Sequence, residues 1–138
     1  MPDMTPRRRT FRRRVVRVAV EEEDDMIDQA EAARVELAAM TGAWRSLASR
    51  WDLTWKERRA LFPKGGEEGP SPCADTETRM RVLVEIGHRV GFDGEEEERE
   101  WLRQPIEMLG WYAPIEVMSG ALGDLRRFRA FVEQGLGS

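Results

Sequence analysis

Apolar residues recur at intervals of three and four through the first half of this chain, which places them on one face of an α-helix. A first series runs from residue 25 to residue 41 and a second from residue 43 to residue 51. The positions in the two series are Met26, Ala30, Ala33, Leu37, Met40, Trp44, Leu47, Ala48 and Trp51. Gly42 lies between the two series, so the sequence predicts two helices with an interruption at this glycine.

A strand is expected at one place at most. The alternation from Val15 to Val20 is compatible with a short strand, but the chain has no second strand pattern that could pair with it. The acidic run from Glu21 to Asp25 favours a helix start instead, because carboxylates are stabilised at the positive end of the helix dipole.

Capping residues and prolines divide the rest of the chain into short helices. Thr54 and Glu57 have the spacing of a capping box, for a helix that runs to Phe62 and stops at Pro63. Asp93 is expected to cap a helix that ends at Pro105. Further helices are expected over residues 75–90, 114–120 and 124–134.

These elements predict an all-α fold, a small helical domain in three parts. Residues 1–23 are expected to form a flexible basic arm, and residues 24–72 a helix-turn-helix-like region with a loop. Residues 73–138 are expected to form a C-terminal helical module. Gly87 lies on the apolar stripe of the helix at 75–90, which indicates close approach by another helix.

Charge is distributed unevenly along the 138 residues. The net charge is -4, yet seven arginines and one acid lie in residues 1–20, which leaves the remainder about ten charges negative. The arm could bind DNA backbone without sequence preference, or it could be a leader without function. The chain lacks a run of roughly 20 apolar residues, so we expect a cytoplasmic protein without a membrane segment.

The sequence offers little for catalysis. It contains no Gly-rich phosphate loop, nucleophile elbow or HExxH pattern, and His88 is its only histidine. Cys73 is the single cysteine and is expected to be a plain loop thiol. The acids from Glu95 to Glu98 point in different directions on a helix start, so capping and solubility explain them better than metal binding. We therefore expect neither an enzyme nor a cofactor or metal.

The C-terminal part carries an ordered set of Trp, Pro and Gly positions that resembles the toxin-binding domain of Xre/MbcA/ParS-type antitoxins. The matching residues are Trp101, Leu102, Pro105, Leu109, Gly110, Ala113, Pro114, Ile115, Met118 and Gly120. The resemblance covers roughly residues 43–136. Two positions depart from it, because Ile106 replaces a common Asn, and Ala113 replaces a Ser that would cap the next helix.

The resemblance implies a type II antitoxin that binds a RES-domain toxin, an enzyme that degrades NAD or transfers parts of it. It also implies a homodimer within a larger toxin–antitoxin assembly. Inhibition would be steric, with the C-terminal helix and tail near the toxin's active-site entrance. A transcriptional regulator that uses the same module for dimerisation, and represses its own operon, is the alternative.

The residues expected to contact the toxin lie beside the motif. Trp111 and Tyr112 are expected in a turn between two helices, where at least one ring should face outward, and aromatic residues are favoured at interfaces. The closing helix and tail form the second candidate contact, although they could equally be a solvated face and a frayed end. The predicted contact residues there are Arg126, Arg129, Glu133, Gln134, Gly135 and Leu136.

Two basic regions are candidates for contact with operator DNA. The helix after Thr54 could place Lys and Arg side chains against phosphates or guanine edges, although Trp55 is bulky and Glu57 is used by the cap. The candidates are Arg7, Arg8, Arg9, Arg12, Arg13, Arg14, Lys56, Arg58 and Arg59.

Overall fold

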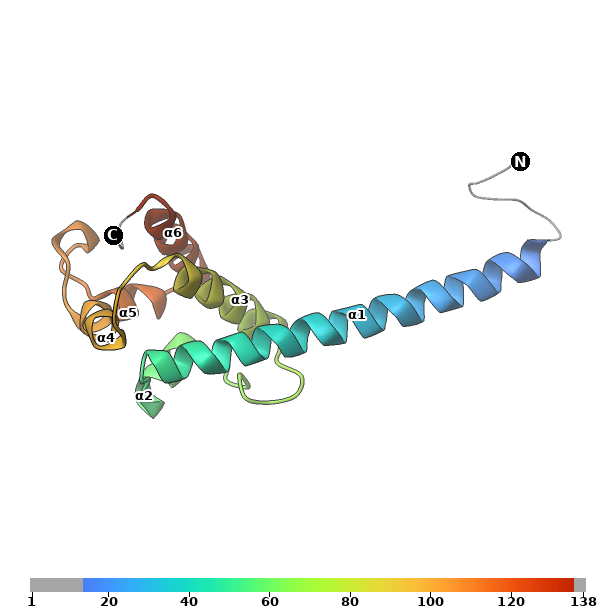
Figure 1. Cartoon of the computed structure of the whole chain (residues 1–138), viewed down its shortest axis with the longest axis horizontal. Helices are drawn as coiled ribbons and strands as arrows, with labels where there is room; N and C mark the ends of the chain where they lie inside the picture. Colours follow the sequence, from blue (N-terminus) through green and yellow to red (C-terminus); the bar gives the residue numbers. More distant parts are fainter. Residues whose placement is uncertain (1–13, 136–138) are drawn as a thin grey trace. The chain divides into compact units, whose positions relative to one another are not determined.

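The computed structural model describes the backbone of residues 14–135 and the side chains of residues 25–135. Over this range the chain is helical, and the backbone bridge between Ile106 and Tyr112 is an isolated one (Figure 1). The elements are α1 (Arg14–Arg50), α2 (Trp55–Leu61), α3 (Ala74–Arg89), α4 (Glu95–Arg103), the 3-10 turn η1 (Glu107–Leu109), α5 (Pro114–Met118) and α6 (Leu122–Glu133). The predicted all-α fold is confirmed. No helix in the described range has the length and apolar character that a membrane span requires.

Backbone contacts divide the chain into unit 1, Met1–Ala38, and unit 2, Ala39–Ser138. The boundary predicted between residues 72 and 73 falls inside unit 2. The boundary predicted between residues 23 and 24 falls inside unit 1.

Helix α1 differs from the sequence prediction at two places. It continues through Gly42, and it is already helical at Arg14. The strand considered for Val15–Val20 is therefore wrong, and residues 14–23 of the predicted arm are helical. A Cβ atom added at Gly42 would have nothing within 4 Å, so this glycine occupies an open helical position. Glycine inside a helix costs about 1 kcal/mol relative to alanine, which weakens a helix without ending it.

The core of unit 2 is formed by large side chains from all six α-helices. Trp44 and Phe62 are buried with their ring centroids 4.9 Å apart in an edge-to-face arrangement. The largest fully buried side chains are Trp44, Trp51, Phe62, Phe128, Leu61, Met80, Leu83, Ile86, Leu102, Met118 and Leu125. Among the helix pairs of this unit, α3 and α6 form the most extensive contact (Figure 1).

Gly87 is the point where α3 meets the C-terminal part of α1. A Cβ atom at this position would lie 2.6 Å from Cδ1 of Leu47, closer than real side chains approach. The prediction of close helix approach at Gly87 is therefore confirmed.

Arg79 on α3 is buried and was not singled out from the sequence. Its Nε donates to the carbonyl of Leu61 at 2.6 Å, and its Nη2 donates to the carbonyls of Met118 and Gly120 at 3.3 and 2.7 Å. These carbonyls lie at the C-terminal ends of α2 and α5, where unpaired acceptors favour a cation. One guanidinium thus joins two helix ends.

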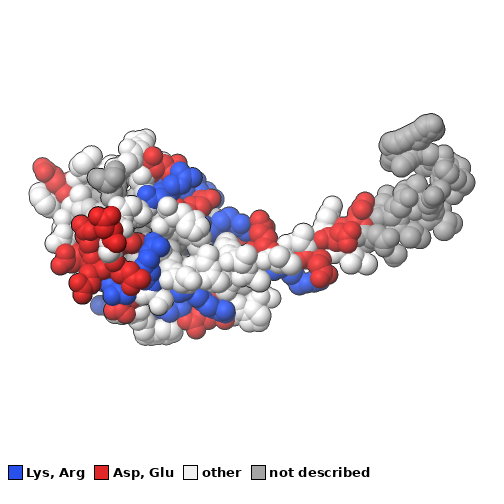
Figure 2. All heavy atoms as spheres, viewed as in Figure 1, with Lys and Arg blue, Asp and Glu red and all other residues white. Residues whose placement is uncertain are grey.

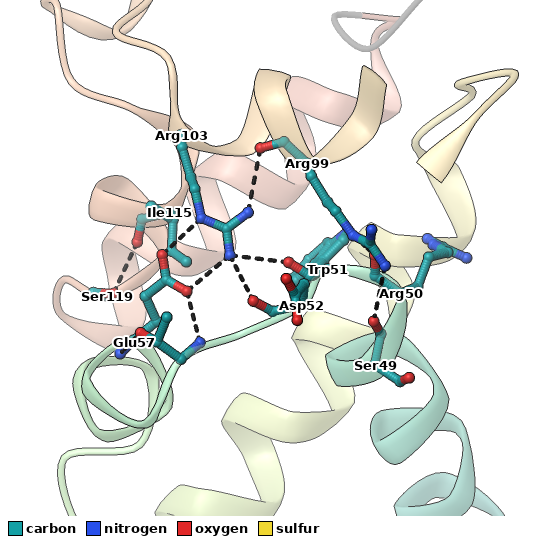
Figure 3. A network of polar contacts seen from close by, with 10 residues as sticks. Ser49, Arg50, Trp51, Asp52, Glu57, Arg99, Arg103, Ile115 and Ser119 are labelled. Carbon is teal, nitrogen blue, oxygen red and sulfur yellow. Dashed lines mark hydrogen bonds and ion pairs between the residues drawn. The ribbon is translucent and has the colours of Figure 1, made fainter. Parts of the chain in front are cut away.

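The region where α1 ends and α2 begins is held by α4 (Figure 3). Arg103 donates to the carbonyls of Trp51 and Asp52 at 2.9 and 3.0 Å, and it pairs with the Glu57 carboxylate at 2.8 Å. Glu57 also completes the capping box with Thr54, as predicted. Partial burial raises the pKa of Glu57, but hydrogen bonds from Arg103 and the Thr54 N–H outweigh it and hold this pKa below its ordinary value.

Glu98 corrects part of the prediction for the acidic run on α4. Glu95, Glu96 and Glu97 are exposed as expected, but Glu98 is buried. Its Oε2 accepts from Nε1 of Trp51 at 2.6 Å and from Nη2 of Arg50 at 2.9 Å. The expected Asp93 cap is also wrong, because α4 begins after Gly94 without a side-chain cap.

Candidate functional site

Residues 106–112 form a closed loop between α4 and α5, which we call the 106–112 loop. The N–H of Ile106 donates to the carbonyl of Tyr112 at 3.1 Å, and the N–H of Trp111 donates to the carbonyl of Ile106 at 2.9 Å. Between these bonds the chain makes the turn η1 and then reverses at Gly110, whose φ of 71° is left-handed. Ile106, the residue that departs from the family pattern, thus anchors the loop through its backbone.

The 106–112 loop displays large side chains to solvent. Met108, Trp111 and Tyr112 are 73%, 66% and 60% exposed. Trp111 also has a left-handed φ of 66°, which costs a residue with a Cβ atom about 1–2 kcal/mol. Strained backbone beside exposed aromatic rings is typical of functional surfaces. The prediction that at least one of the two rings faces outward is confirmed for both.

A groove of about 490 Å³ runs beside this loop, between α5 and α6. Its walls are mainly apolar, with two carboxylates and one guanidinium among them. The lining residues are Met108, Leu109, Tyr112, Glu116, Val117, Gly120, Asp124, Arg127, Phe128 and Phe131. Asp124 and Arg127 pair with each other at 2.8 Å, so the polar groups of the groove are partly satisfied within α6.

The start of α5 positions one groove residue. Ala113 cannot cap this helix, as the sequence indicated, but Glu116 reaches back and its Oε1 accepts from the Ala113 N–H at 2.8 Å. Pro114 stands at the first helical position, as predicted. The Glu116 side chain is thereby fixed at the groove while it remains exposed.

Two anchors of the motif are packing residues, and one of them, Trp101, contacts a residue that lines the groove. Leu102 is fully buried, whereas Trp101 is half-buried, with its ring 5.2 Å from Phe92 and 6.2 Å from Phe128 between centroids. The same Phe128 lines the groove. Packing by Trp101 therefore sets the position of the α6 wall.

The toxin-contact residues predicted on α6 do not lie on the groove. Arg129 pairs with Glu85 on α3 at 2.6 Å, and Glu133 pairs with Arg89 at 3.7 Å. Arg126, Gln134 and Gly135 are exposed, and Leu136 lies outside the described residues. The groove side of α6 instead carries Asp124, Arg127, Phe128 and Phe131, a set whose three- and four-residue spacing was visible in the sequence.

The predicted DNA-contact residues on α2 are in different surroundings. Lys56 and Arg59 are exposed, and the Arg59 guanidinium lies 5.5 Å from the ring centroid of Trp55. Arg58 is drawn into the following loop, where it pairs with Glu67 at 3.1 Å and also with Glu68. The arginines predicted in the arm from Arg7 to Arg13 lie outside the described residues, and of Arg14 only the backbone is described.

Among the side chains described, no three from His, Cys, Asp and Glu gather where a metal ion could be held. His88 and Cys73 are both exposed and lie outside the groove. What the 106–112 loop and the groove can do chemically is bind an apolar surface.

No protein-family model, curated protein or solved structure matches this chain.

Proposed function

We propose that this protein is an antitoxin of a type II toxin–antitoxin system, which binds a RES-domain toxin and inhibits it sterically. One observation supports the proposal above the others. Met108, Trp111 and Tyr112 are exposed on a hydrogen-bonded loop next to an apolar groove, in the same segment that carries the family-like motif.

The arrangement has the properties of a binding hot spot. Trp and Tyr contribute most to interface energies when a partner removes them from water, and a groove beside them can accept a side chain in return. The bonds that close the 106–112 loop fix the backbone that carries the two rings, which reduces the entropy lost on association. Such a surface inhibits by occupying space, so it needs no catalytic group.

The C-terminal end of α6 is the proposed blocking element. Gln134 and Gly135 are exposed at the end of the helix, and small residues follow them in the sequence. Arg126 is exposed on the same helix and could face acidic residues of the toxin or a phosphate group of its substrate. The ion pairs of Arg129 and Glu133 with α3 would hold the helix that carries this end.

The experiment is co-expression with the product of the neighbouring open reading frame. The double variant Trp111→Ala/Tyr112→Ala should bind that product about 30- to 1,000-fold more weakly and lose protection of growth. Trp55→Ala is the matched control, because Trp55 is 70% exposed but lies on α2. Wild-type binding by the double variant would reject this surface as the toxin contact.

A truncation after Phe131 distinguishes binding of the toxin from inhibition of the toxin. We expect the shortened chain to retain binding through the 106–112 loop and to lose growth protection. Full protection by this chain would show that the end of α6 does not block the toxin.

A DNA-binding regulator is the weaker candidate. On α2 the cations Lys56 and Arg59 are exposed, while the third candidate, Arg58, is paired with two acids. Binding to the operon's own promoter that weakens steeply with salt, and is lost when residues 1–20 are removed, would support this function.

A further inference from the structure

We infer that unit 1 pairs with unit 1 of a second copy of this chain, as two antiparallel helices joined along Met26, Ala30, Ala33 and Leu37. This inference does not depend on the proposed toxin. It rests on the exposure, spacing and charge of the part of α1 within unit 1.

The helix of unit 1 carries apolar side chains that are in water. Met26 is 67% exposed, Ala30 and Ala33 are exposed, and Leu37 is partly exposed. Most of the stability of helices in proteins comes from packing of an apolar face, so this helix is expected to need a partner surface. The four residues are separated by four, three and four positions, which is the spacing of a coiled-coil seam.

The order of side-chain sizes along this seam fits a second copy of the same helix that runs in the opposite direction. Read from either end, it is large, small, small, large, with Met26 and Leu37 outside and the two alanines inside. A second copy running in the opposite direction therefore places Met26 against the second copy's Leu37, and Ala30 against its Ala33. A twofold axis perpendicular to the helices produces this pairing, and the alanines allow the two backbones to approach closely.

Charge selects the antiparallel direction. Five consecutive acids, Glu21 to Asp25, precede the seam, and acidic side chains are prominent along the described part of this helix in Figure 2. Parallel copies would bring the two acidic runs side by side. Antiparallel copies separate the two Glu23 residues by roughly 25 Å, beyond the Debye length at physiological salt.

Sedimentation velocity of the full chain over a concentration series tests the pairing. The seam is short, so we expect a dimer with a dissociation constant of roughly 10–100 µM. Ala33→Glu should raise that constant at least ~30-fold, because it puts a carboxylate inside the seam. The matched control Val35→Glu introduces the same charge two residues away, at a position that is 65% exposed and off the seam, and it should leave the dimer unchanged. Circular dichroism should show equal helix content in both variants.

Cysteine cross-linking tests the direction, in a Cys73→Ser background that removes the exposed native thiol. A mixture of Met26→Cys and Leu37→Cys chains should form a mixed disulfide, whereas each chain alone should stay largely uncross-linked. Cross-linking of Met26→Cys with itself would overturn the antiparallel arrangement. A wild-type chain that is monomeric at 10 times the expected dissociation constant would overturn the pairing itself. So would a dimer that Ala33→Glu does not weaken, or one that both glutamate variants weaken equally.

Discussion

Two stretches of α1 have the same apolar spacing and opposite surroundings. Met26, Ala30 and Ala33 in unit 1 are exposed, whereas Trp44 and Leu47 in unit 2, and Trp51 directly after the helix, are almost fully buried. In both stretches the intervals alternate between three and four residues. The spacing therefore specifies a helix with an apolar face, and it does not specify what covers that face.

Covering comes from elements that are distant in the sequence. Phe62, after α2, places its ring against Trp44, and Gly87 on α3 lets Leu47 approach within the space a side chain would fill. Unit 1 has no counterpart to these elements within its own described residues. Exposed apolar faces on a folded chain are commonly docking surfaces, and this is the reason for proposing that unit 1 pairs with a second copy of itself.

The largest effect is expected when one side chain in each stretch is truncated to alanine and the free energies of unfolding are compared. Trp44→Ala should lower the free energy of unfolding by about 3–5 kcal/mol, because it empties a packed site. Met26→Ala should change it by less than about 0.5 kcal/mol in dilute solution. Urea denaturation of both variants measures the difference, and comparable losses would mean that Met26 is already covered in the monomer.

The next largest loss of stability is expected from the hydrogen bonds of buried Glu98, at the end of the buried stretch. Glu98→Ala leaves the Trp51 N–H and the Arg50 guanidinium without the buried carboxylate, and should cost about 2–4 kcal/mol. Glu97→Ala, at the exposed neighbouring position, should be nearly neutral. If the two variants unfold at the same urea concentration, the Glu98 contacts contribute nothing to stability.

Substitutions at two glycines compare a helix surface that is packed against another helix with one that is open. Gly87→Ala should destabilise unit 2 by about 1–3 kcal/mol, because its Cβ would meet the Leu47 side chain at 2.6 Å. Gly42→Ala should stabilise the protein by about 0.5–1 kcal/mol, since its site is open and alanine favours a helix. Thermal unfolding should move in opposite directions for the two variants, and a gain in Gly87→Ala would exclude close packing there.

The smallest expected effect is the pH dependence of the Glu57–Arg103 pair. The pKa of Glu57 is lower in the folded chain than its ordinary 4.5, so the unfolded chain binds more protons as the solution is acidified. The stabilisation is complete above pH 4.5 and is lost as pH falls through the folded pKa. The hydrogen bond to Glu57 raises the pKa of Arg103, so only the carboxylate titrates in this window.

Glu57→Gln should therefore cost about 1 kcal/mol at pH 7 and progressively less as the pH is lowered below 4.5. Urea unfolding of the two proteins at pH 7 and at a series of pH values below 4.5 measures this. A difference that stays constant across the series would mean that the charge of Glu57 is not what stabilises α2.

Local signals predicted several elements well. Thr54 and Glu57 form the expected capping box, and Pro114 opens α5, because both depend on residues within four positions of each other. The exposure expected for at least one of Trp111 and Tyr112 followed from their place in a turn between two helices, and both are exposed. The break at Gly42 was wrong, because a single glycine weakens a helix by less than its neighbours stabilise it.

The groove and the buried charges could not be found in this way. Met108 and Phe131 become neighbours of Tyr112 only when α5 and α6 fold back against the 106–112 loop. In the sequence, Glu98 cannot be distinguished from the three acids before it, nor Arg79 from other helical arginines. Their burial depends on partners from distant segments: the end of α1 for Glu98, and the ends of α2 and α5 for Arg79.

By itself the sequence determined that the chain is helical, which residues form the apolar face of each helix, and the motif that suggests a toxin-binding module. These depend on spacing and on contacts with near neighbours along the chain. The tertiary structure alone decided which of the equivalent apolar faces is buried and which charged side chains are satisfied inside. Burial depends on surfaces contributed by distant segments, and the periodicity of one helix carries no information about the segment that will cover it.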